Sequence, residues 1–113
     1  MKDMLTHKGY HGSIHYNSED KVFFGKVEFI RAIVSYEGRD AESLEAAFVE
    51  AVEDYFALCA EQGREPEKPF KGSFNVRITP ELHERVAIAA SQHGMSLNRF
   101  VAEALNQAVT QAD

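Results

Sequence analysis

The chain has 113 residues, 44% of them hydrophobic, and a formal net charge of −6 at pH 7. This composition indicates a globular protein and excludes a disordered chain, and the length allows one ordinary domain or two very small ones. A single cysteine excludes an intramolecular disulfide. Because neither a signal peptide nor a run of roughly 18 apolar residues is present, we expect a cytoplasmic protein without membrane contact.

The negative charge is concentrated in the first part of the chain. Residues 1–71 contain nine Lys or Arg and fourteen Asp or Glu, a net −5, whereas residues 72–113 contain three and four, a net −1. An acidic surface attracts basic proteins and repels nucleic acid. The first part therefore suits a basic protein partner better than DNA, with an ordinary solvated acidic surface as the alternative.

Three short segments near the N-terminus have the pattern of β-strands. Residues 9–16 place Tyr10, Ile14 and Tyr16 on one face, residues 22–27 are largely apolar, and residues 33–36 end before a glycine. Their short connections predict an antiparallel meander.

A long amphipathic helix is predicted next, beginning after Asp40 as N-cap and ending at Gly63. Its apolar residues recur every three or four positions, so one face should pack on the sheet and bury Cys59 as a core thiol. The stripe consists of Leu44, Ala47, Phe48, Ala51, Val52, Tyr55, Phe56 and Cys59. Residues 1–63 thus form a predicted β-β-β-α domain of the α+β class.

Residues 64–72 contain two prolines, several charges and a final glycine, a composition typical of a semi-rigid linker. Beyond it, residues 73–113 form the second predicted domain. Residues 73–78 alternate as a strand, with Phe74, Val76 and Ile78 on its apolar face. Two helices follow, one starting at Thr79-Pro80 and ending at Gly94, the other capped by Ser96.

The single strand at residues 73–78 has no partner strand within its own domain, and an unpaired apolar strand is unstable in water. Pairing with the same strand of a second chain would let Phe74, Val76 and Ile78 form a shared dimer core. Addition to the N-terminal sheet as a fourth strand is the alternative. The sequence therefore favours a homodimer and leaves open a higher oligomer.

In such a dimer, the polar face of the ribbon presents Ser73, Asn75 and Arg77 twice. A two-stranded ribbon fits the major groove, where Arg can bind guanine, Asn can bind adenine and Ser can bind either kind of base edge. The start of the second helix offers free N–H groups at Leu97 and Asn98 for phosphate. We expect Ser73, Asn75 and Arg77 to read bases. The residues at the start of the second helix should bind phosphate, namely Ser96, Leu97, Asn98 and Arg99.

This C-terminal segment resembles the ribbon-helix-helix family of repressors. The resemblance runs from Ser73 to about Val109 and is carried by Phe74-Asn75-Val76-Arg77 and by Gly94-Met95-Ser96-Leu97-Asn98. In that family the outward residues of the ribbon read bases, and the start of the second helix binds a phosphate of the DNA backbone. The resemblance implies the same two roles for the corresponding residues here. A helical dimerisation module without DNA binding is the alternative.

The whole chain is similar to HicB-type antitoxins. The similarity rests on Gly9-Tyr10, Phe24-Gly25-Lys26-Val27, Tyr36-Glu37-Gly38, residues 47–55, residues 63–69 and residues 97–101. It implies a partial RNase H-like N-terminal fold that neutralises a small HicA-like mRNA-cleaving toxin, and a C-terminal domain that represses the operon encoding both. A stand-alone regulator, whose N-terminal domain senses a ligand or mediates oligomerisation, is the second hypothesis.

The sequence offers no convincing catalytic site. A metal-dependent nuclease needs several converging carboxylates, and nothing in the sequence marks the acidic residues as such a set. The candidates are Asp20, Glu28, Glu37, Glu53 and Asp54. His11 and His15, four residues apart on one strand, would lie roughly 13 Å apart, too far to share one zinc ion. We therefore expect no enzyme activity, no metal and no cofactor.

Overall fold

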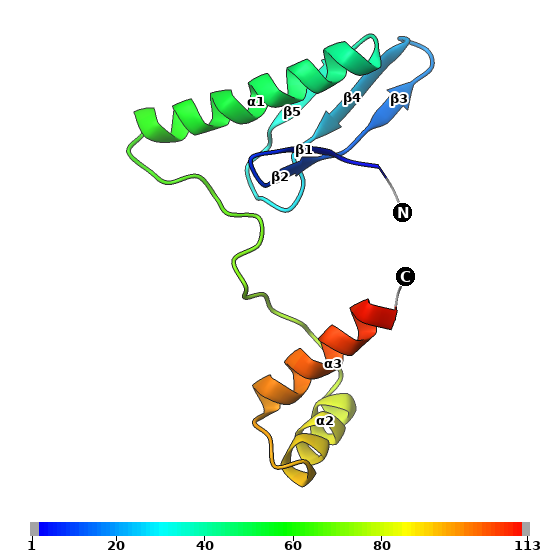
Figure 1. Ribbon diagram of the computed structural model, residues 1–113, viewed down its shortest axis with the longest axis vertical. Helices are drawn as coiled ribbons and strands as arrows, with labels where there is room; N and C mark the ends of the chain where they lie inside the picture. Colours follow the sequence, from blue (N-terminus) through cyan, green and yellow to red (C-terminus); the bar gives the residue numbers. More distant parts are fainter. Residues whose placement is uncertain (1–2, 112–113) are drawn as a thin grey trace. The chain divides into compact units, whose positions relative to one another are not determined.

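The computed structural model describes residues 3–111, and their contacts divide the chain into two units (Figure 1). The first unit ends at Ser73 and the second begins at Phe74. No helix within residues 3–111 is long and apolar enough to cross a membrane. The elements are β1 (Leu5–His7), β2 (Tyr10–Gly12), β3 (His15–Asn17), β4 (Val22–Lys26), β5 (Ser35–Gly38), α1 (Ala41–Glu61), α2 (Pro80–Gln92) and α3 (Leu97–Gln111).

The strands of the first unit form two small antiparallel sheets, β1-β2 and β3-β4-β5. The second sheet confirms the predicted three-stranded antiparallel meander, and the β1-β2 hairpin is an addition to it. Strand β1 was not predicted from the sequence; it pairs with β2 across a two-residue turn. Both turn residues, Lys8 (φ 49°) and Gly9 (φ 81°), are left-handed. Two positive φ angles match the right-handed twist of a hairpin, and glycine at the second position lowers their cost.

The predicted strand over residues 9–16 is wrong as a single strand, because the chain passes from one sheet to the other at Ser13. Gly12 ends β2 in a place without room for a side chain, since an added Cβ would lie 2.2 Å from Tyr36 Oη and 2.7 Å from Phe48. The Ser13 N–H then donates to the Lys26 carbonyl at 3.0 Å. An alternating pattern of apolar residues cannot reveal such a change of strand partner, because β2 and β3 are both extended and show the same alternation.

The third strand lies two residues later than predicted. Ile33 is 92% exposed, and β5 begins only at Ser35. It extends through Gly38, where an added Cβ would lie 2.5 Å from the Leu44 N of α1. Close approach of α1 therefore explains the glycine, which lies at the end of the strand and not beyond it.

Helix α1 confirms the predicted amphipathic helix and packs along β5 and β4 (Figure 1). Asp40 caps it by accepting a hydrogen bond from the Ser43 N–H at 2.7 Å, and Gly63 (φ 69°) follows its end. The predicted stripe forms the core, in which Phe48 is fully buried and Cys59 is 1% exposed. The buried core residues are Tyr10, Val27, Tyr36, Leu44, Phe48, Val52, Tyr55 and Cys59.

Glu67, in the middle of the predicted linker, is held by the first unit. Its carboxylate accepts hydrogen bonds from the N–H groups of Arg31 (2.8 Å) and Ala32 (2.9 Å), which lower its pKa. Its own N–H donates to the Tyr55 hydroxyl at 2.9 Å, and its carbonyl accepts from the Tyr10 hydroxyl. The linker boundaries at residues 64 and 72 stay a prediction, but the chain is fixed to the first unit at Glu67.

Candidate functional site

The second unit consists of an extended segment, residues 74–79, and the helices α2 and α3. Thr79 caps α2 as predicted, by accepting a hydrogen bond from the Leu82 N–H at 3.1 Å with Pro80 in the first turn. Gly94 (φ 66°) follows its end, and the Met95 N–H donates to the Ala90 carbonyl at 3.0 Å. Both helix limits thus follow from the local sequence.

One side of this helix pair is apolar and uncovered. Among the described residues of the second unit, Ala90 is the only buried hydrophobic residue, and α3 has none. Between the helices lies a hollow of about 410 Å³. Its lining includes Val76, Ile78, Leu82, Val86, Leu97, Phe100, Val101 and Leu105. A unit of this size buries a small share of its surface and usually needs further stabilisation, so we expect this side to be covered.

The extended segment before α2 has no strand partner in the structure, since no residue of 73–79 belongs to either sheet of the described chain. Its apolar residues are exposed, Phe74 to 73%, Val76 to 63% and Ile78 to 43%. The alternative that this segment forms a fourth strand of the N-terminal sheet is therefore wrong. Its role as the core of a dimer stays a prediction.

The predicted base-reading residues Ser73, Asn75 and Arg77 are all exposed, Ser73 directly before this segment and the other two on it. They alternate with the apolar residues Phe74 and Val76, so an extended backbone places the two sets on opposite faces. The structure thus leaves these polar side chains accessible, and their contact with bases stays a prediction.

The predicted phosphate-binding residues lie together at the start of α3. The Ser96 hydroxyl accepts a hydrogen bond from the Arg99 N–H at 3.1 Å and so caps the helix. The first N–H groups of a helix have no acceptor within it and carry partial positive charge. Arg99 Nε lies 3.4 Å from a Glu103 carboxylate oxygen, a weak and exposed pair that an incoming phosphate would have to displace. Phosphate binding here stays a prediction.

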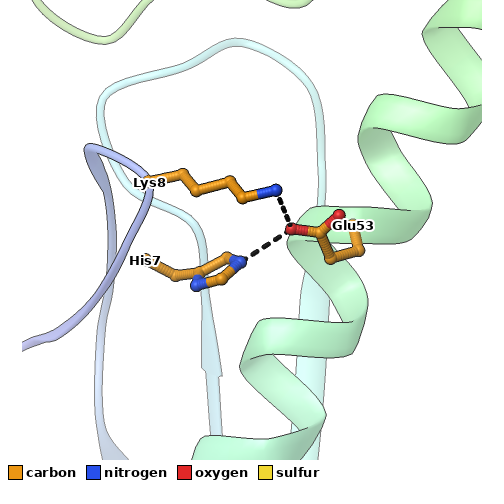
Figure 2. A network of polar contacts seen from close by, with 3 residues as sticks. All are labelled: His7, Lys8 and Glu53. Carbon is orange, nitrogen blue, oxygen red and sulfur yellow. Dashed lines mark hydrogen bonds and ion pairs between the residues drawn. The ribbon is translucent and has the colours of Figure 1, made fainter.

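In the first unit, one of the carboxylates considered for catalysis belongs to an ion-pair network instead. Figure 2 shows His7 and Lys8, from the β1–β2 hairpin, pointing at the Glu53 carboxylate of α1. His7 Nε2 and Lys8 Nζ each lie 2.8 Å from the same Glu53 oxygen, Oε2. Hydrogen bonds from Lys8 and His7 lower the Glu53 pKa. Glu53 thus fastens the hairpin to the helix.

Within residues 3–111, no group of three or more His, Cys, Asp or Glu side chains is placed to hold a metal ion.

Two features of the first unit had no signal in the sequence. The Glu67 contacts with Arg31, Ala32 and Tyr10 join residues 35 positions or more apart in the chain, and the exposure of Ile33 contradicts its apolar character. Only packing in three dimensions decides such positions.

Comparison with known proteins gives one match. The HicB family model matches residues 55–105. This range covers the end of α1, the connecting segment, α2 and most of α3, somewhat less than half of the chain, and it supports the HicB-type resemblance. No curated protein and no solved structure matches the chain. The RNase H-like and ribbon-helix-helix folds therefore stay predictions.

Proposed function

We propose that this protein is a cytoplasmic antitoxin of a type II toxin–antitoxin pair, without enzyme activity of its own. It neutralises a small HicA-like mRNA-cleaving toxin through its first unit. Through its second unit it dimerises, binds operator DNA as a ribbon-helix-helix protein and represses its own operon.

The observation that carries this proposal is the incomplete second unit. The apolar residues Phe74, Val76 and Ile78 are exposed. Val76 and Ile78 border a hollow that is lined almost wholly by apolar side chains. The backbone of the same segment has no ladder partner in the described chain. An antiparallel copy of the segment would satisfy both needs at once, by pairing the backbone and by covering the apolar face.

The match to the HicB family supports the antitoxin part. Its range, residues 55–105, includes α2, most of α3 and the segment that would form the ribbon. The charge distribution agrees with it. The acidic first unit suits a basic protein, while the nearly neutral second unit needs few positive charges to bind DNA because the ribbon would present Arg77 twice.

DNA binding is tested with the purified chain and a duplex from upstream of its own gene. Replacing Arg77 by Ala should weaken specific binding by about 1–3 kcal/mol, because a base contact is lost, and should leave the dimer intact. Arg85→Ala is the matched control, since Arg85 is an exposed arginine of the same unit on α2. Equal affinities of the two variants would remove Arg77 from the base-reading residues.

The antitoxin role is tested by co-expression with the product of the adjacent gene, which the proposal expects to be a small basic protein. We expect the two proteins to co-purify and the complex to lose RNA cleavage. Specific DNA binding without any such complex would favour the stand-alone regulator instead.

A further inference from the structure

The first unit has its own uncovered hollow, of about 300 Å³, where α1 meets the segment leading into β5. Ile33 and Val34 line it from the segment, and Tyr55 and Leu58 line it from α1. Strand β5 is the end member of its sheet, so one of its edges faces no strand of the described chain. The hollow thus lies beside a free strand edge.

Two of the lining side chains are large, apolar and exposed. Ile33 is 92% exposed and Leu58 is 45% exposed. Single exposed hydrophobic residues are ordinary on protein surfaces. Two such residues that border one hollow form a patch, and patches of this kind mark sites of protein interaction.

The charges around the hollow indicate which kind of partner fits. Helix α1 carries six carboxylates and no lysine or arginine: Glu42, Glu45, Glu50, Glu53, Asp54 and Glu61. Asp54 lines the hollow, and Glu50 and Glu61 lie on the same row of the helix at intervals of four and seven residues. Arg64 is the one cation in the lining, so it offsets only one of the three carboxylates of this row.

We propose that this hollow is the docking site of the basic protein partner. An apolar side chain of the partner enters between Ile33 and Leu58, and its lysine or arginine side chains lie along the row of carboxylates. The inference rests on the proposed function, and it adds the surface that the partner occupies.

The same charges disfavour the other occupants. A second copy of this chain, docked by the same face, would bring two rows of carboxylates together, and like charges across an interface cost affinity. The phosphates of DNA would be repelled for the same reason. A basic partner instead gains from both the apolar and the charged part of the site.

The test uses the full-length chain and the purified product of the adjacent gene, with affinities measured by calorimetry. Ile33→Asp and Asp54→Lys should each weaken the complex at least tenfold. Ile14→Asp and Asp20→Lys are the matched controls, since Ile14 is 40% exposed and Asp20 is exposed, both outside the hollow. The controls should bind as the wild type does, and all four variants should keep wild-type DNA affinity.

A wild-type complex that all four variants form with equal affinity would overturn the docking site and leave the antitoxin role intact. If the wild type forms no complex, the partner half of the proposed function fails, and the docking site fails with it. Ile33→Asp should leave the oligomeric state of the chain unchanged in the absence of the partner. A change would show that the hollow lies in an interface between copies of this chain, and it would also overturn the proposal.

Discussion

The two units of this chain differ in whether each encloses a core of its own. The first buries a cluster of side chains from its sheets and α1, with Phe48 fully enclosed. The second, within its described residues, buries only Ala90 among its hydrophobic residues and leaves the apolar side of both helices open. We therefore expect the first unit to fold from its own contacts and the second unit to need a second chain.

The largest effect is expected from the core of the first unit. Phe48→Ala removes a fully buried ring and should lower the free energy of unfolding by about 3–5 kcal/mol. The matched variant Phe24→Ala, at a side chain that is 41% exposed, should lose far less. Urea unfolding followed by circular dichroism compares the two. Equal losses would show that the first unit lacks the core described here.

The second prediction concerns the open unit. Phe74→Asp should raise the dimer dissociation constant on the order of 100-fold, because burying an unpaired carboxylate at a dimer core costs several kcal/mol. Phe70→Asp is the control, since Phe70 is 63% exposed but belongs to the first unit. Sedimentation equilibrium measures both. Phe74→Asp dimerising like the control would place the interface elsewhere.

A smaller effect is expected in the connecting segment, where Glu67 is held by hydrogen bonds to the first unit and Glu65 is exposed. In the wild type the two carboxylate oxygens of Glu67 accept hydrogen bonds from the N–H groups of Arg31 and Ala32. Glu67→Gln keeps one of these acceptor oxygens and replaces the other with an NH₂ group, which cannot accept. Amide exchange at these two residues should therefore accelerate a few-fold, whereas Glu65→Gln, at an exposed neighbour, should leave it unchanged.

The same contact has a predictable pH dependence. Hydrogen bonds from Arg31 and Ala32 lower the folded-state pKa of Glu67. A lowered folded pKa stabilises the folded state above the unfolded pKa, and this stabilisation is lost as the pH falls through the folded value. The protection factors of the two amides should therefore drop in acid in the wild type and stay flat in Glu67→Gln.

The helices could be predicted from the sequence because their signals are local. Each helix is capped by a side chain that accepts a hydrogen bond from the N–H group three positions later. The capping residues are Asp40, Thr79 and Ser96. The apolar stripe of α1 likewise depends only on spacing, and it forms the core as expected.

The strands were predicted less well, because pairing depends on residues that are distant in sequence. The break at Ser13 follows from the close approach of Tyr36 to Gly12, and the late start of β5 follows from a loop that leaves Ile33 in solvent. Of the candidate site, the sequence placed Ser73, Asn75 and Arg77 on an accessible segment. It could not reveal the hollow beside Ile33, which exists only after α1 has packed on the sheet.

The central claim, that residues 73–78 are completed by a second chain, is tested most directly by hydrogen exchange of their backbone amides at several protein concentrations. Pairing into a ribbon predicts slow exchange in the concentrated protein and fast exchange once dilution separates the dimer, with the amides buried in α1 unaffected throughout. Fast exchange of residues 73–78 at every concentration, in a protein that remains monomeric, would contradict the account.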